Sequence, residues 1–114
     1  MTKPREMQPF RWLNLVDTSH YGQAFDEQAA RIKIASLGRD HFVKWMEGRR
    51  TPLGRALTRS FLKVVHTHKL EASPDGDYQK IAFKTSFERK ADAVEAVVVT
   101  KETGHWQVSG YRLY

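Results

Sequence analysis

The chain of 114 residues contains no cysteine. This absence excludes disulfide bonds, thiolate metal ligands and cysteine nucleophiles together. Long hydrophobic runs are missing as well. Residues 1–10 contain no stretch that could form the apolar core of a signal peptide, and no later stretch is long enough to span a bilayer. We therefore expect no transmembrane segment.

Known catalytic and cofactor-binding signatures are also missing. The sequence contains no nucleophile elbow, phosphate-binding loop, zinc-binding helix motif or dinucleotide fingerprint. We therefore expect no catalytic residues, no metal and no cofactor.

Acidic residues are missing from one segment. Residues 48–70 contain six of the 19 basic residues and no acid, so the other thirteen match the 13 acidic residues elsewhere, and this segment accounts for the net charge of +6. An anionic partner would be attracted here. Nucleic-acid binding ranks only third among the functional hypotheses, because single strands need stacking aromatics and the segment contains only Phe61.

The residues that are present predict one folded domain. Hydrophobic residues make up 40% of the chain, which is enough for one core, whereas two cores would each be too small to be stable without crosslinks. We expect a flexible N-terminal tail at residues 1–8 and a single domain over residues 9–114.

Apolar residues first recur at helical spacing. This spacing predicts helices at Pro9–Asp17, at Tyr21–Ala35 and from Asp40 to the pair Arg49 and Arg50. From about Leu57 the period becomes close to two, which predicts four strands. The expected fold is α+β, with three N-terminal helices packed on one face of a curved four-stranded antiparallel sheet.

The second and fourth strands carry specific expectations. Ile81, Phe83 and Phe87 should point at the helices, with Lys80 and Lys84 in solvent. In the fourth strand, Trp106 and Val108 should face one way, and Tyr111 and Leu113 the other.

A set of motifs suggests a family. They are Trp12-Leu13 through Asp17 and Tyr21; Arg50-Thr51-Pro52-Leu53-Gly54 and Arg59; Asp75-Gly76-Asp77-Tyr78; Phe83-Lys84-Thr85-Ser86-Phe87; Glu95; and Trp106-Gln107-Val108-Ser109-Gly110-Tyr111. In this order the chain resembles the bacterial domain-of-unknown-function family 4019. Family members usually carry tryptophan at a position where this chain has Phe25.

The resemblance implies a fold but no activity. It implies the cystatin-like cone of the nuclear transport factor 2 superfamily, in which helices close over a curved sheet. Many family members resemble exported proteins of Gram-negative bacteria, so the periplasm or cell envelope is the compartment that the resemblance suggests.

Glu95 lies among valines in the third predicted strand. A carboxylate there needs a cationic partner, and Arg59 is the candidate. A purely structural pair is the favoured interpretation; a general base or ligand anchor inside the cone is the alternative. The candidate ligand-binding residues, none of them catalytic, are Arg50, Arg59, Glu95, Tyr111 and Trp106.

His66 and His68 are two residues apart on one predicted strand face, a spacing at which two imidazoles can share a metal ion. A third ligand would have to come from His20, His41, His105 or a carboxylate. Two histidines on a half-exposed strand is the favoured interpretation.

The leading functional hypothesis is a non-catalytic binding or accessory protein that recognises a small molecule or a protein through a cone pocket or the outer sheet face. An isomerase or hydratase that uses a polar residue in the pocket is the alternative.

A homodimer through the sheet is also expected. The third predicted strand is apolar on both faces, with Val94, Ala96 and Val98 on one and Val97 and Val99 on the other. Helices can cover only one face, and Tyr111 and Leu113 could join the uncovered row. A second copy could then cover that row, and Val97→Glu is the substitution that the pattern suggests as a test.

Overall fold

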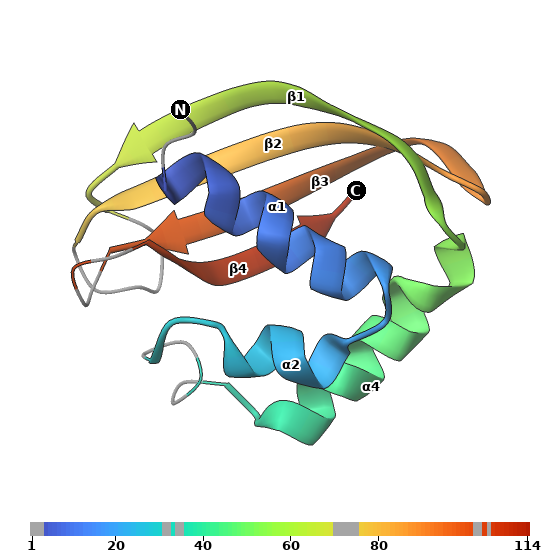
Figure 1. The fold of residues 1–114 in the computed structure, drawn as a ribbon, viewed down its shortest axis with the longest axis horizontal. Coiled ribbons are helices and arrows are strands. Elements are labelled where there is room, and N and C mark those ends of the chain that lie inside the picture. Colours follow the sequence, from blue (N-terminus) through green and yellow to red (C-terminus); the bar gives the residue numbers. More distant parts are fainter. Residues whose placement is uncertain (1–3, 31–32, 34–35, 70–75, 102–103, 105) are drawn as a thin grey trace.

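A computed structural model describes residues 4–30, 33, 36–69, 76–101, 104 and 106–114, with side chains from Phe10 onward. Three helices come first, and the 3-10 turn η1 (Thr51–Leu53) leads into the sheet. The helices are α1 (Pro4–Asp17), α2 (Tyr21–Asp26) and α4 (Arg39–Arg49), and the strands are β1 (Ala56–Thr67), β2 (Tyr78–Phe87), β3 (Lys90–Thr100) and β4 (Gln107–Leu113). The predicted α+β order is confirmed (Figure 1).

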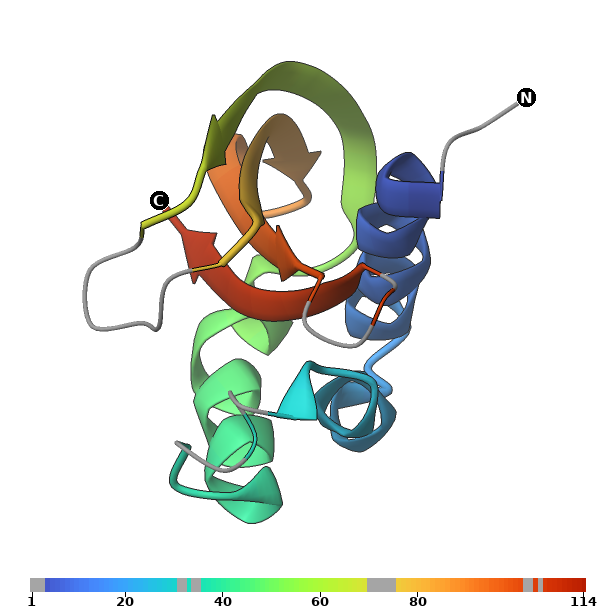
Figure 2. The ribbon, with the colours of Figure 1, turned by 90° about the vertical axis from the view of Figure 1, so that its left-hand side faces the viewer.

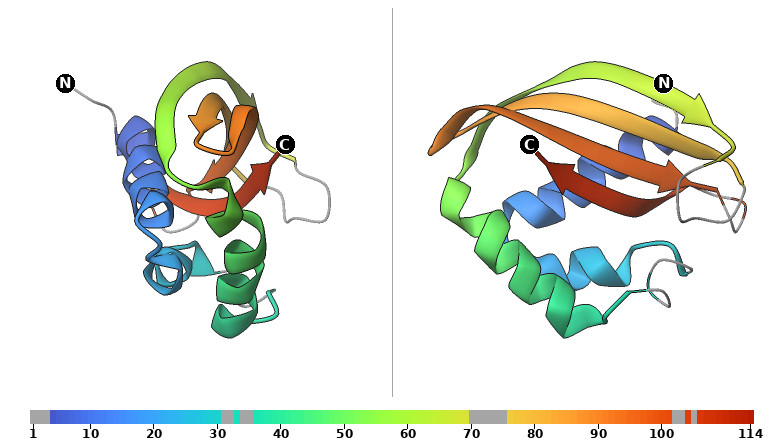
Figure 3. Two further views of the ribbon diagram at one scale, coloured as in Figure 1. Left: turned by 90° about the vertical axis from the view of Figure 1, so that its right-hand side faces the viewer. Right: turned by 180° about the vertical axis from the view of Figure 1, so that it is seen from behind.

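The sheet is an antiparallel meander with the strand order β1-β2-β3-β4. Helix α1 packs against β3 and β4, while α2 and α4 pack against each other farther from the sheet. The sheet is strongly curled, and the helices lie on one side of it (Figure 2). β1 is consequently the edge strand farthest from α2 and α4 (Figure 3).

The predicted orientation of β2 is confirmed. Ile81, Phe83 and Phe87 are buried, and Lys80 and Lys84 are exposed. This alternation follows from the two-residue period of a strand with one covered face. Ile81 and Phe83 of β2 join Trp12 and other apolar side chains of α1 in one core.

The predicted orientation of β4 is wrong because the strand contains a bulge. Val99 pairs with Val108 and Val98 pairs with Gly110, so one extra β4 residue lies between the two pairs. A bulge shifts the alternation of side chains by one. Val108 and Tyr111 are therefore both buried on the helix-facing side.

The ends of two helices differ from the sequence-based expectation. Helix α1 begins at Pro4 rather than Pro9, so residues 4–8 are helical instead of forming a tail. Proline suits a first helical position because it has no N–H to leave unpaired there. Helix α2 ends at Asp26, which interrupts the predicted helix, and the Ala29 N–H donates to the Val108 carbonyl of β4.

Two expected features fall on residues 31–32, 34–35 and 70–75. The end of the second predicted helix and most of the turn before β2 lie outside the described residues.

Candidate functional site

Glu95 of β3 is fully buried on the helix-facing side of the sheet. Thr85 and Arg59 both donate to its Oε1 atom, from Oγ1 at 2.5 Å and from Nε at 2.8 Å. The Tyr111 hydroxyl donates to Oε2 at 2.5 Å. Strand pairing explains the convergence. Arg59 lies opposite Thr85, and Tyr111 lies opposite Val97, which is two residues from Glu95 and therefore on the same face of β3.

Arg59 joins β1 to both β3 and α1. Besides its contact with Glu95, its two terminal nitrogens donate to the two carboxylate oxygens of Asp17 at 2.8 and 3.0 Å. This fork-to-fork geometry is the strongest form of an ion pair. Burial alone would lower the pKa of Arg59, but the hydrogen bonds and charges of Asp17 and Glu95 raise it above its ordinary value.

Arg50 reaches the same cluster from the end of α4. It donates to Asp17 Oδ1 at 3.2 Å and to the Gly54 carbonyl at 2.5 Å. Its guanidinium lies 4.4 Å from the centre of the Phe87 ring, a favourable cation–π distance. Its Nε is the one buried side-chain nitrogen or oxygen without a hydrogen-bond partner in the described part of the chain.

These contacts define one unit, which we call the polar network; its members are Asp17, Arg50, Arg59, Thr85, Glu95 and Tyr111. Two arginines balance two carboxylates, as buried charges require. Three donors already occupy the Glu95 carboxylate, which leaves it little free acceptor capacity. Burial, followed by the charge and hydrogen bond of Glu95, raises the pKa of Tyr111, so its hydroxyl stays protonated near neutral pH.

Sequence reasoning found most of this network. Four of the five candidate residues, Arg50, Arg59, Glu95 and Tyr111, come together in it. The fifth, Trp106, packs against the hydrophobic core just before β4. Asp17 and Thr85 were not selected as candidates, although Asp17 ends the first amphipathic helix and Thr85 falls on the buried face of β2.

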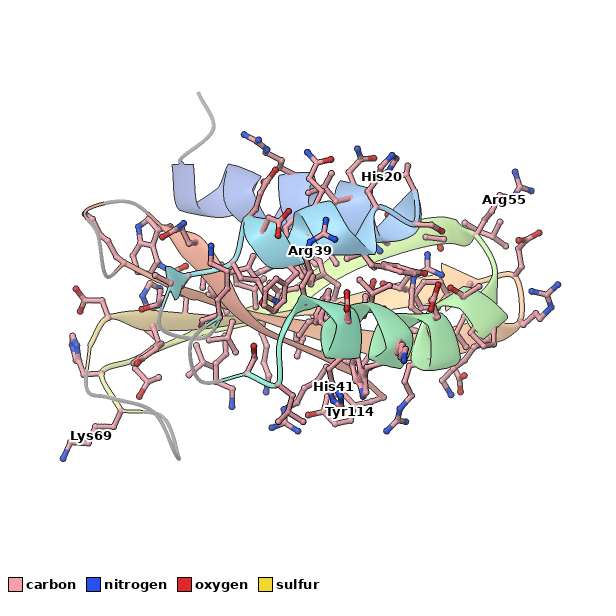
Figure 4. The ribbon with its side chains drawn as sticks, turned by 90° about the horizontal axis from the view of Figure 1, so that it is seen from below. His20, Arg39, His41, Arg55, Lys69 and Tyr114 are labelled. Carbon is pink, nitrogen blue, oxygen red and sulfur yellow. The ribbon has the colours of Figure 1, made fainter. Side chains whose placement is uncertain are left out.

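The four histidines among the described residues do not gather into a metal site. His66 is exposed on β1, whereas His68 lies beyond the end of the strand with Nδ1 3.0 Å from an Asp77 carboxylate oxygen. His20 and His41 lie on different sides of the helical layer (Figure 4). Among the described residues, no group of three potential ligands could hold a metal ion.

The basic segment is dispersed. Two of its arginines, Arg50 and Arg59, are neutralised in the polar network. Arg55 and Lys69 project at opposite ends of the molecule (Figure 4), and Arg55 faces Glu88. The segment therefore presents no compact cluster of arginines to a phosphate backbone.

The largest apolar exposure lies on β1. Five large hydrophobic side chains are between 39% and 58% exposed: Leu57, Phe61, Leu62, Val64 and Val65. We call them the β1 edge surface. Soluble proteins rarely expose so many neighbouring apolar side chains without a partner.

The apolar rows of β3 are better covered. Val97 and Val99 are fully buried among the core residues, and Tyr111 is buried beside them. Val94, Ala96 and Val98 form the outer row, and each is partly exposed. Val97 therefore cannot contact a second copy, because the helices cover its side of the sheet.

None of the described helices is both long and apolar enough to cross a membrane. A family model described as "Protein of unknown function (DUF4019)" matches residues 9–111, so the chain belongs to this family. A comparison with curated proteins found no match.

Proposed function

We propose that this member of the family is a non-catalytic binding module that recognises a protein partner through the β1 edge surface. One contrast carries the proposal: the buried Glu95 carboxylate is paired with Arg59 and Tyr111, whereas apolar side chains on β1 are exposed. An edge strand with exposed apolar residues is a characteristic site of association with another chain.

An isomerase or hydratase function receives less support. A general base needs a carboxylate that can reach a substrate proton. The Glu95 carboxylate instead accepts from Arg59, Thr85 and Tyr111 and has no exposed surface. The same pairing argues against a small-molecule site built on Glu95 or Arg59.

The order of three helices followed by a four-stranded meander is the order expected of a cystatin-like, nuclear transport factor 2-like cone. That comparison favours neither a binding module nor an enzyme, because fold alone specifies no chemistry. It leaves the exposed strand as the feature from which function must be argued.

The test is affinity capture with matched variants. The double variant Leu62→Ser/Val65→Ser removes two exposed side chains of the β1 edge surface, and Leu37→Ser removes an exposed leucine that precedes α4. We expect wild type and Leu37→Ser to capture the same protein from an extract of the native host, and the double variant to lose it. A partner that the double variant retains would overturn the proposal.

Self-association through the outer sheet face is the second candidate. Gly110 lies next to Val98, since a Cβ at Gly110 would be 3.6 Å from the Val98 Cβ. Glycine has no side chain, so it leaves Val98 uncovered. Val98→Glu is therefore the appropriate substitution. A dimer through this face should dissociate in sedimentation velocity on Val98→Glu, and a dimer that persists would exclude this face.

A further inference from the structure

We propose that the free edge of β1 binds an extended, acidic segment of a partner protein as an additional antiparallel or parallel strand. The inference rests on the proposed function and adds the backbone geometry and the charge of the partner. Strand addition obtains affinity from main-chain hydrogen bonds and specificity from alternating side chains.

The two edges of the sheet are not equivalent. On β4, the Val108 carbonyl accepts from the Ala29 N–H, so the segment after α2 covers part of that edge. β1 is 12 residues long and pairs with β2 on one side. In the described part of the chain, no backbone hydrogen bond joins residues 57–67 to any segment other than β2. One row of main-chain donors and acceptors on β1 is thus available to another strand.

Apolar side chains flank this free edge on both faces of the sheet. Phe61 pairs with Phe83, and Val64 pairs with Ile81, so both lie on the helix-facing side. Val65 pairs with the exposed Lys80 and lies on the outer side. An added strand would therefore place apolar residues against β1 on both of its faces.

The charge around the edge selects among possible occupants. Neither β1 nor β2 contains an acidic residue. Lys63 pairs with Ala82, which lies between Lys80 and Lys84 on the outer face of β2. Lys63 is therefore on the same outer face as these two lysines. All three lysines are exposed, and none forms an ion pair with another described residue.

A second copy of the chain fits this edge poorly. Pairing β1 with β1 of a copy would bring two sets of these lysines together, and like charges across a strand pair are destabilising. A partner strand with Asp or Glu would instead place opposite charges beside Lys63. Charge complementarity therefore favours an acidic segment over self-pairing.

The first experiment uses a synthetic peptide of about ten residues, the upper end of usual strand lengths, that alternates Glu with Val and Thr. The matched control peptide carries Lys in place of Glu. Amide hydrogen exchange of the full chain is followed by NMR at millimolar peptide. We expect the acidic peptide to protect alternate amides within residues 60–66, because alternate N–H groups of a strand point to one edge, and we expect the lysine peptide to protect none.

A charge reversal tests the electrostatic part. Lys63→Glu should weaken binding of the acidic peptide about two- to fivefold, the effect of one exposed charge pair. Lys44→Glu changes the net charge equally but lies on α4, away from β1, and should leave binding unchanged.

The proposal fails if the acidic peptide leaves the amides of β1 unprotected, or if the lysine peptide protects them equally. It also fails if β1 amides become protected as the protein alone is concentrated, since a second copy would then occupy the edge. If a captured partner depends on Leu62 and Val65 yet leaves those amides unprotected, the binding function stands and strand addition is wrong.

Discussion

Replacing Arg59 with methionine should destabilise the protein by about 3–5 kcal/mol, the typical result of removing one partner of a buried ion pair. Methionine keeps the aliphatic stem but removes the cation. Asp17 retains Arg50, and its side chain is 23% exposed, so water can replace part of what it loses. Glu95 retains the hydroxyls of Thr85 and Tyr111 but loses the only cation that touches it among the described residues. Most of the loss therefore arises at Glu95.

This loss is a large share of the 5–15 kcal/mol that typically stabilises a domain. Urea unfolding followed by tryptophan fluorescence measures it, because Trp12 is buried in the core. Arg55→Met is the matched control. Arg55 precedes the same strand, but its side chain is 80% exposed in its contact with Glu88, so its loss should cost less than about 1 kcal/mol.

The second variant, Glu95→Gln, separates charge from shape. Glutamine keeps one acceptor oxygen for one of the two hydroxyls, presents an NH2 group that the other hydroxyl oxygen can accept from, and needs no cation. The double variant Arg59→Met/Glu95→Gln should therefore lose less stability than the sum of the single variants, by about 1–3 kcal/mol. The reasoning is refuted if Arg59→Met costs no more than Arg55→Met, or if the two substitutions at the network are additive.

Two further predictions follow from other contacts. The pKa of Tyr111 is raised above its ordinary value of 10.0, so its contribution to stability is complete below pH 10 and declines above it at about 1.4 kcal/mol per pH unit as the unfolded chain ionises. Tyr111→Phe should remove this alkaline loss and the exposed Tyr114→Phe should not, as urea unfolding between pH 9 and 12 would show. Gly54 has φ 78°, and a Cβ there would lie 2.7 Å from Glu88 Oε1, so Gly54→Ala should cost about 1–3 kcal/mol. Gly48→Ala, in the last turn of α4 with open space around the added Cβ, should instead stabilise by up to about 1 kcal/mol, and thermal unfolding of both variants checks the pair.

The fold class and the register of β2 were predictable because each follows from local periodicity. A strand with one covered face must alternate, and Ile81, Phe83 and Phe87 left a single consistent orientation. The faces of β4 were missed, because one bulge residue reverses the alternation. Gly110, which directly follows the extra residue, is the sequence signal that could have indicated the bulge. The end of helix α2 at Asp26 was missed for a similar reason, because the Ala29 N–H that follows it donates to the Val108 carbonyl of β4, which is distant in sequence.

The polar network was predictable in part. Glu95 stood out as a charge among valines, and Arg59 was named as its candidate cation. The role of Asp17 was not visible, because its partners lie 33 and 42 residues away. A helix-terminal aspartate has many ordinary roles, and only the packing of α1 on the sheet selects this one.

The exposure of β1 could not be inferred from its sequence, because its apolar residues resemble those of a covered strand. Which strand becomes the uncovered edge depends on where the helices pack, and α1 packs against β3 and β4.

The polar network and the β1 edge surface are two parts of one strand. Arg59 fixes the first half of β1 to α1 through Asp17 and to β3 through Glu95. Two residues later, Phe61 is 58% exposed, and the exposed side chains of Leu62, Val64 and Val65 follow it along the strand. An edge strand that is anchored at one end loses little further conformational entropy when a partner pairs with the other end, which favours binding. The buried ions thus hold in place the strand through which we propose that a partner binds.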